Sequence, residues 1–297
     1  MRRVAVILTC FNRRDTTLAC LDRLKTQTAV TEELGARERA ATAEVTVFLV
    51  DDGSTDGTAD AVRDAHPEVH IIEGTGDLFW NRGMHRSWAT AIEAGGFDHY
   101  FLLNDDTILF PDALEQLIRA AEAPEDGSGR VGLAVGATTD PVTGELTYGG
   151  YVSNSKWNPM KLRHRLLSET EPVVTMNCNA VLVPAAVVEQ VGQMDPTYHH
   201  SWGDIDLGYR ASKAGFVLSV PPVPIGHCEP NPQGTDAHNN PDLNLRDRIK
   251  FINSIRGLNK ADWFYLVRQH GGPVWPLVWA SPYVNLGVMW ARQKLRR

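Results

Sequence analysis

The chain has 297 residues, of which 43% are hydrophobic and 22% are charged, and its formal net charge is -7. This composition is typical of a globular protein with a sizeable core, and an acidic balance without a long basic run argues against nucleic-acid binding. The four cysteines have no C-x-x-C spacing, which excludes a zinc ribbon or a thioredoxin-type motif and predicts free thiols in a reducing cytoplasm.

In the first part of the chain, apolar runs alternate with segments of helical spacing. Strands are predicted at Val4–Thr9, Val45–Val50, Val69–Ile72 and His99–Asn104, each followed by a helix, at Thr16–Thr28, up to Arg63, at Met84–Ala94 and at Asp112–Ala123. Arg2 and Arg3 precede the first run as they would in a signal peptide, but so short a run without a small-residue cleavage site favours a strand. The alternation predicts an α/β domain with a mainly parallel sheet.

The residue composition changes after Ala134. Gly136–Pro159 is rich in turn residues, which predicts a hairpin or a long loop. Further on, the pattern predicts a strand at Thr175–Pro184, helices at Ala185–Val191 and Asp206–Ala214, a strand and loop at Phe216–His227, and a mobile loop at Pro230–Asp242. The charged segment Thr31–Glu44 predicts a solvated surface without a functional role.

The C-terminal segment Gly271–Ala291 carries no formal charge and is followed by the basic sequence RQKLRR. Its length approaches that of a bilayer span, but Pro273, Pro276 and Pro282 interrupt it. Tryptophans beside a basic cluster are typical of an interfacial membrane anchor. A helix packed on the protein's own surface or in an oligomer interface remains the alternative.

Polar features follow several predicted strands, at the sheet edge where open α/β sheets bind ligands. Asp51 and Asp52 begin a turn, which predicts either helix capping or a contact with a nucleotide base or ribose. The Gly-spaced loop Gly74–Met84 can bring backbone N–H groups close to phosphates, although it matches neither G-x-G-x-x-G nor a Walker loop. Its Trp80 is a stacking platform for a sugar or base, or a core residue.

Acidic residues also follow the predicted strand "YFLLN" and lie at the start of the segment "GDIDLGYR". Alternation along the first of these predicts that Asn104 and Asp106 face one side and Asp105 the other. A carboxylate there suits Mg²⁺ or Mn²⁺ completed by diphosphate oxygens, and helix capping is the alternative. In the second, Asp206 can begin a helix and pair with Arg210, which leaves Asp204 to point into a cleft as a general base.

These features, in this order, resemble the family 2 glycosyltransferases, which have the GT-A fold. The resemblance covers roughly residues 3–230 and rests on the motifs TCFNR, VDDGSTDG, GTGDLFWNRGM, LLNDDT, GQMDPTYHHSWGDIDLGYRASKAG and HCE. Within the family, the chain is most similar to bacterial rhamnosyl- and galactofuranosyl-type transferases of cell-surface polysaccharide synthesis. The resemblance implies a GT-A domain at 1–230, with a nucleotide-sugar half (1–110) and an acceptor and catalytic half (111–230), and a loop and helical tail at 231–297.

The family's functional residues carry over to matching positions here. Donor-binding roles fall on Thr9, Phe11, Asn12, Asp51, Asp52, Gly76, Trp80, Gly83, Met84, Asn104 and Asp105. The metal motif Asp-x-Asp reads Asn104-Asp105-Asp106, so Asp106 would bind Mn²⁺ or Mg²⁺, together with His227, which lies at a strand end where a histidine is either structural or a ligand. Acceptor-binding roles fall on His200, Trp202, Gly203 and Asp206.

The base of the family's Glu-Asp motif corresponds to Asp204, with Gly203 in place of the Glu. The resemblance therefore implies an inverting, metal-dependent transfer of sugar from a UDP-, dTDP- or GDP-linked donor to a glycan or lipid-linked glycan. We expect a cytoplasmic protein, with a peripheral contact at the inner face of the plasma membrane and a homo-oligomer both left open. The rival readings are a nucleotidyltransferase acting on sugar phosphates and, because of Gly203 and Asn104, a non-catalytic glycan-binding or assembly partner.

Overall fold

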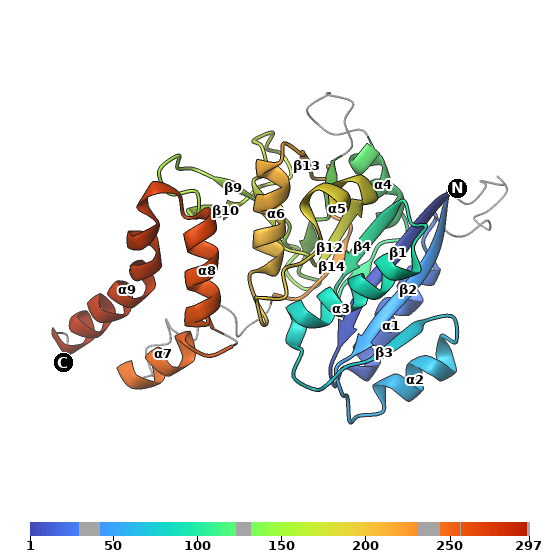
Figure 1. The fold of residues 1–297 in the computed structure, drawn as a ribbon, viewed down its shortest axis with the longest axis horizontal. Coiled ribbons are helices and arrows are strands. Elements are labelled where there is room, and N and C mark those ends of the chain that lie inside the picture. Colours follow the sequence, from blue (N-terminus) through green and yellow to red (C-terminus); the bar gives the residue numbers. More distant parts are fainter. Residues whose placement is uncertain (30–41, 123–131, 231–243, 256, 296–297) are drawn as a thin grey trace.

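The computed structural model describes residues 1–29, 42–122, 132–230, 244–255 and 257–295. Its centre is a seven-stranded sheet in the order β13-β6-β12-β4-β1-β2-β3 (Figure 1). Strands β1 (Arg2–Cys10), β2 (Ala43–Asp51), β3 (His70–Glu73) and β4 (His99–Leu103) are parallel. Strand β12 (Ala180–Pro184) runs antiparallel between β4 and β6 (Leu133–Val135), and β13 (Leu218–Ser219) closes the edge. The sheet is thus mostly parallel, as the alternation predicted.

Helices cover both faces of this sheet because its strands are apolar on both sides. Val4, Val6 and Leu8 of β1 face one core, whereas Ala5 and Ile7 face the other. The first core includes α1 (Arg14–Lys25), α2 (Thr58–Ala65) and α4 (Ala113–Glu122). The second includes α3 (Phe79–Ala94), α5 (Ala185–Val191) and α6 (Gly203–Lys213). Alternating side chains on a strand packed between two helical layers give this division.

Two small sheets complete the central domain. One has the order β10 (Leu162–His164), β9 (Gly150–Ser153), β11 (Thr175–Met176), and the other β5 (Ile108–Leu109), β14 (Gly226–His227), β7 (Thr138–Thr139), β8 (Leu146–Tyr148). The predicted strand Thr175–Pro184 is therefore two strands, β11 and β12, in different sheets. Gly136–Pro159 contains the antiparallel pair β7–β8, so the hairpin alternative is confirmed. The predicted loop Pro230–Asp242 and most of Thr31–Glu44 lie outside the described residues.

The C-terminal region consists of α7 (Leu245–Ile252), α8 (Lys260–His270), a 3₁₀ turn η1 (Gly272–Val274) and α9 (Trp275–Leu295). Figure 1 places these helices beyond α6, on the side away from β1–β3. They share a third apolar cluster with the domain, in which Ile205 and Tyr209 of α6 meet Trp263 and Leu266 of α8. Among the described residues, no helix has the length and apolarity needed to cross a bilayer. The tail is thus a helical unit packed on α6.

Candidate active site

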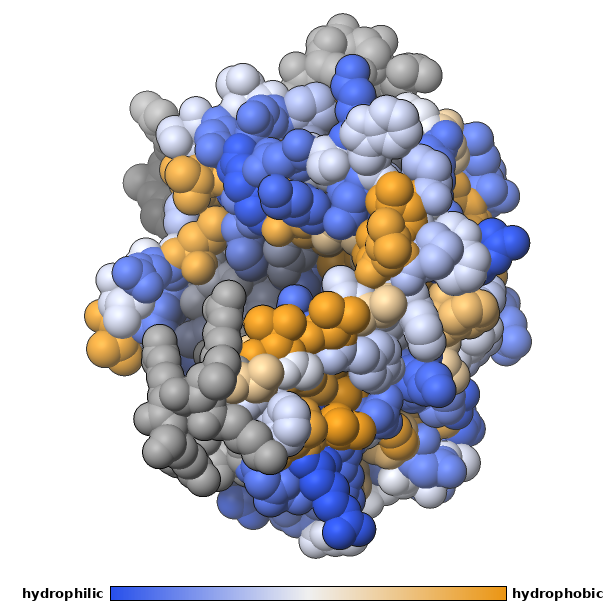
Figure 2. All heavy atoms as spheres, turned by 90° about the vertical axis from the view of Figure 1, so that its left-hand side faces the viewer, coloured by the Kyte–Doolittle hydropathy of each residue, from blue (hydrophilic) through white to orange (hydrophobic). Residues whose placement is uncertain are grey.

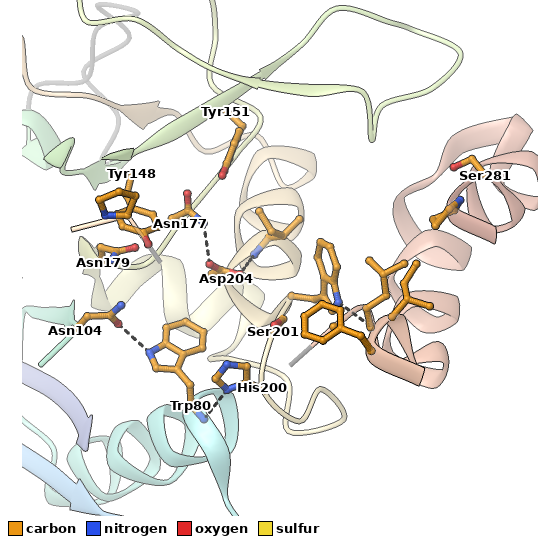
Figure 3. Close-up of a pocket in the computed structure, with 18 of the residues that line it drawn as sticks. Trp80, Asn104, Tyr148, Tyr151, Asn177, Asn179, His200, Ser201, Asp204 and Ser281 are labelled. Carbon is orange, nitrogen blue, oxygen red and sulfur yellow. Dashed lines mark hydrogen bonds between the residues drawn. The ribbon is translucent and has the colours of Figure 1, made fainter. Parts of the chain in front are cut away.

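One cavity of about 990 Å³ runs from the central sheet to the C-terminal helices. Figure 3 shows its wall, with Asn104 and Trp80 at one end, Asp204 in the middle and Ser281 of α9 at the other. The polar end is formed by residues that follow β1 and β4, at the carboxyl edge of the central sheet, and by Asn177 and Asn179, which lie between β11 and β12. This is where ligands bind in open α/β sheets.

The tip of β4 separates the neighbouring acids as the alternation predicted. Asn104 and Asp106 line the cavity, whereas Asp105 is 4% exposed and is not part of its wall. The Asn104 side chain accepts a hydrogen bond from Trp80 Nε1 at 2.8 Å, which fixes the indole against the strand tip. Burial raises the pKa of Asp105 to about 7, although Arg13 opposes that shift.

Arg13, which the motif analysis did not single out, bridges both acids. Its Nη1 is 3.1 Å from Asp105 Oδ1, and its Nη2 is 2.8 Å from Asp106 Oδ2. The two carboxylates therefore stabilise a positive charge at this position. Within the described residues, no group of three or more His, Cys, Asp and Glu side chains could hold a metal alone. Asp106 nevertheless suits a Mg²⁺ or Mn²⁺ site, because such ions commonly take one or two carboxylates and complete their shell with substrate phosphates.

The second predicted metal ligand, His227, lies apart from this pair. Its Nδ1 is 3.1 Å from Thr139 Oγ1, and its ring packs edge-on against Phe110 with centroids 4.8 Å apart. The next residue, Cys228, is the one whose Sγ approaches Asp106, at 3.5 Å from Oδ1. Because successive side chains of an extended segment point to opposite sides, His227 faces away from Asp106 in this conformation. A ligand role for His227 stays a prediction.

Asp204 stands in the first turn of α6 and lines the middle of the cavity. Its Oδ1 accepts a hydrogen bond from Ile205 N at 2.8 Å, and its Oδ2 is 3.4 Å from Asn177 Nδ2 (Figure 3). Burial raises the pKa of Asp204 and outweighs the hydrogen bonds that its carboxylate accepts, which include one from the backbone of Cys178. A carboxylate with a raised pKa on the cavity wall is suited to receive a proton.

Asp206, predicted to contact acceptor, is a buried residue that pairs with two side chains. It is 1% exposed and is not part of the cavity wall. Its Oδ2 accepts from Arg210 Nε at 2.6 Å, as the i, i+4 spacing predicted, and its Oδ1 lies 2.8 Å from His270 Nε2 of α8. Burial acts to raise the pKa of Asp206, but His270 and Arg210 prevail and lower it. A contact of Asp206 with the acceptor stays a prediction.

The other predicted acceptor residues do lie at the cavity or beside it. His200 and Trp202 line it, and Trp202 Nε1 donates to Leu258 O at 3.0 Å. There is a steric reason for glycine at position 203, because a Cβ there would lie 1.6 Å from Asn81 Oδ1. Asn81 cannot yield easily, because it is fully buried and its Nδ2 donates to two backbone carbonyls at 2.8 Å.

On the predicted donor side, the two acids after β2 brace loops. Asp52 accepts hydrogen bonds from the backbone N–H groups of Gly76, Leu78 and Phe79, at 2.8–3.0 Å. Asp51 Oδ1 accepts from Ser54 N at 2.9 Å. Both carboxylates are nearly buried, so their described contacts shape the Gly-rich loop and the turn. A direct contact of either with nucleotide stays a prediction.

The remaining residues that were predicted to bind the donor differ in their exposure to solvent. Phe11 is 51% exposed, and Asn12 has φ 52° with its Oδ1 accepting from Thr55 N at 2.7 Å. Met84 is fully buried in the second core and is not on the cavity wall, and its contact with donor stays a prediction. Thr9 is 8% exposed and packs against Gly83, where a Cβ would lie 2.3 Å from Thr9 Oγ1. This contact lets α3 lie close to β1.

Comparison with known proteins agrees with this geometry. Residues 5–181 match the model of glycosyl transferase family 2. The chain belongs to that family.

As a family 2 glycosyltransferase, the protein has relatives of known name. Two proteins called N-acetylglucosaminyl-diphospho-decaprenol L-rhamnosyltransferase, from Mycobacterium tuberculosis strains CDC 1551 / Oshkosh and ATCC 25618 / H37Rv, are each 24% identical to it over 258 residues. Those matches cover 80% of this chain and 78% of each relative. A mannosyltransferase from Pyrobaculum calidifontis, solved in complex with GDP-Man and Mn²⁺, has the same fold at a TM-score of 0.54 and 16% identity, over 99% of this chain and 84% of its own. The GT-A fold expected from the motifs is thus confirmed.

No role was predicted for several residues of this glycosyltransferase's cavity, although Arg13 ends the motif TCFNR. These are Arg13, Tyr148, Tyr151, Asn177, Asn179 and the apolar side chains of α7 and α9. One signal was available for the two asparagines, because "TMNCNAVLVP" places them inside an otherwise apolar run. Polar residues at alternate positions of a buried segment indicate a shared polar environment on one side.

Proposed function

We propose that this protein is an inverting, metal-dependent glycosyltransferase that transfers a sugar from a nucleotide diphosphate-sugar to a hydroxyl of a lipid-linked glycan in cell-surface polysaccharide synthesis. L-Rhamnose is the first candidate sugar, because the two mycobacterial relatives are named as rhamnosyltransferases acting on N-acetylglucosaminyl-diphospho-decaprenol. The observation that carries the proposal is that one cavity contains both Asp204, with its raised pKa, and Asp106, which pairs with a cationic group.

In this proposal Asp204 is the general base. Oδ1 is held by the Ile205 backbone amide, so Oδ2 is the atom that receives the proton of the acceptor hydroxyl. As that proton leaves, the acceptor oxygen forms a bond to the anomeric carbon. The bond from that carbon to the donor diphosphate breaks, and its electron pair leaves with the diphosphate. Attack from the face opposite the leaving group inverts the anomeric configuration.

The leaving diphosphate would lie at the Asp106 end of the cavity. Arg13 and Trp80 also line that end, where the guanidinium offers charged donors and the indole offers a flat face for a sugar. A divalent cation held there by Asp106 and diphosphate oxygens would act as a Lewis acid that neutralises the charge on the leaving group. Trp80 is oriented by its bond to Asn104, which gives the first residue of the Asn-Asp-Asp sequence a positioning role.

The proposal is tested by a transfer assay. The protein is incubated with UDP-, dTDP- or GDP-linked sugars, Mn²⁺ and a synthetic N-acetylglucosaminyl diphosphate lipid, and the product linkage is determined by NMR. We expect a single preferred donor, a product of inverted anomeric configuration and loss of transfer on chelation of the metal. Retention of configuration, or full transfer in the presence of a chelator, would contradict the mechanism.

A further inference from the structure

The end of the cavity farthest from Asp106 is apolar. Its wall is formed by side chains of α7, of the segment before α8 and of α9, namely Phe251, Ile252, Leu258, Pro282, Leu286, Val288 and Met289. We call this part of the cavity the apolar arm. Figure 2 looks onto the C-terminal side of the molecule and shows a hollow with hydrophobic surface along part of its rim. The arm is continuous with the space around Asp204, because both belong to one cavity.

The contribution of α9 to this wall has helical periodicity. Ser281, Asn285 and Val288 are spaced by four and three residues, and Pro282, Leu286 and Met289 repeat the same spacing one position later. Such residues form a single face of a helix. Ser281 Oγ donates to Val278 O at 2.8 Å, so the hydroxyl of this face is already satisfied. One side of α9 is thus turned toward the cavity.

This face is not simply core. Leu286 is 2% exposed, but Val288 on the same face remains 44% exposed beside an open cavity. Exposure of apolar side chains to water costs about 25 cal/mol per Å² of surface. An apolar ligand that covers this wall removes that cost. A nucleotide diphosphate is polar and charged, so it gains little from this wall.

Two further apolar side chains of the same helix lie at the border of this face, because Leu277 precedes Ser281, and Val284 precedes Val288, by one helical turn. Leu277 and Val284 are 72% and 60% exposed and do not line the cavity. A membrane contact of the tail would use residues of this outward kind. The arm instead opens into the site of the reaction, and an amphiphilic acceptor fits it end to end, with its reacting sugar at Asp204.

We propose that the apolar arm binds the first segment of the acceptor's hydrocarbon chain, next to its diphosphate. This inference rests on the proposed function, which supplies a lipid-linked acceptor, and adds that the protein itself, and not only a surrounding bilayer, recognises the chain. The occupant is an unbranched or isoprenoid hydrocarbon segment. Recognition of this kind makes the acceptor's lipid a determinant of affinity in free solution.

The test compares two soluble acceptors in the absence of membranes. N-Acetylglucosaminyl diphosphate esters carrying either a methyl group or an undecyl chain are titrated into the full chain by calorimetry, below the micelle-forming concentration. Burial of a methylene gives about a fourfold gain, so three buried methylenes predict about 60-fold tighter binding of the undecyl ester. Equal affinity for the two esters, or no binding of the undecyl ester, would overturn the inference.

Matched variants of α9 locate the effect. Val288→Asp introduces a carboxylate into the arm and should weaken undecyl binding at least tenfold while leaving the methyl ester unaffected. Val284→Asp is the control, because it makes the same substitution four residues earlier, off the cavity wall, and should leave both affinities unchanged. Equal losses in the two variants would indicate a general surface effect and refute the arm.

The two proposals fail separately in this design. Transfer to the methyl ester without any advantage of the undecyl ester rejects the apolar arm and retains the glycosyltransferase mechanism. Chain-dependent binding that is abolished by Val288→Asp, without transfer from any nucleotide sugar, retains the arm and rejects the proposed reaction.

Discussion

Replacement of Asp204 by Asn separates catalysis from structure more sharply than any other change in this cavity. The variant keeps a carbonyl oxygen that can accept from Ile205 N at 2.8 Å. The 3.4 Å contact between Oδ2 and Asn177 Nδ2 is lost, because two amide groups then face each other, and the backbone hydrogen bond from Cys178 is weakened with it. The loss of unfolding free energy is therefore about 1–2 kcal/mol, the usual net contribution of one or two hydrogen bonds.

The expected effect of the substitution on the catalytic rate is much larger than its effect on stability. An amide cannot take the proton of the acceptor hydroxyl, and loss of a general base lowers turnover by about 10²–10⁴-fold. We expect Asp204→Asn to reduce kcat by that factor while the melting temperature and the affinity for nucleoside diphosphate remain near those of the wild type. Initial rates at saturating donor and acceptor, together with thermal unfolding and calorimetry, give the three quantities.

The pH profile provides a second readout of the same residue. Because burial raises the pKa of Asp204, the wild-type rate should climb with pH along an acidic limb centred above the ordinary value of 3.8. That limb reports loss of the carboxyl proton, so it should be absent from the residual activity of Asp204→Asn. A variant with kcat within tenfold of the wild type, or one that keeps the acidic limb, would refute the assignment of Asp204 as the base.

Three further substitutions test the surroundings of this base. Asp206→Asn, in the same helical turn, breaks a buried pair with His270 and should lower the free energy of unfolding by about 3 kcal/mol. Because the pKa of Asp206 is lowered in the folded state, the wild type should be more stable than the variant in urea melts above pH 3.8, and this difference should decrease as the pH falls further. Gly203→Glu restores the family's acid yet should lower the melting temperature and the activity, because the new Cβ would collide with Asn81, and an unchanged melting temperature would contradict that. Arg13→Gln removes the cation that bridges the acid pair and should tighten Mn²⁺ binding without nucleotide about tenfold by calorimetry, whereas weaker binding would show that Arg13 does not compete with the metal.

Features set by local sequence were predictable. The direction of Asn104, Asp105 and Asp106 follows from the twofold alternation of a strand, and the pairing of Asp206 with Arg210 follows from helical spacing. Both depend on residues within four positions of each other, where backbone geometry leaves little choice. The parallel arrangement of β1–β4 followed in the same way from alternating strands and helices.

Features set by contacts between distant segments were not predictable. Arg13 meets Asp105 across 92 residues, and Asn177 meets Asp204 across 27. The absence of a side chain at residue 203 depends on Asn81, which reaches the start of α6 from α3. No periodicity in one chain encodes such pairs, because they arise only when loops from separate elements converge at the edge of the sheet.

The C-terminal helices hold the segment that leads to Asp204 in place. Asp262 of α8 accepts from both the backbone N–H and Nδ1 of His199, each at 2.9 Å, in the segment that leads to Asp204. The Leu258 carbonyl holds the indole of Trp202 at 3.0 Å, and His270 holds Asp206. Deletion of residues 245–297 would therefore release this segment and expose Ile205 and the α6 cluster, so a loss of activity would say nothing about membranes. A substitution confined to the outward face, such as Leu277→Asp, isolates the membrane question, because Leu277 is 72% exposed and lies off the cavity wall.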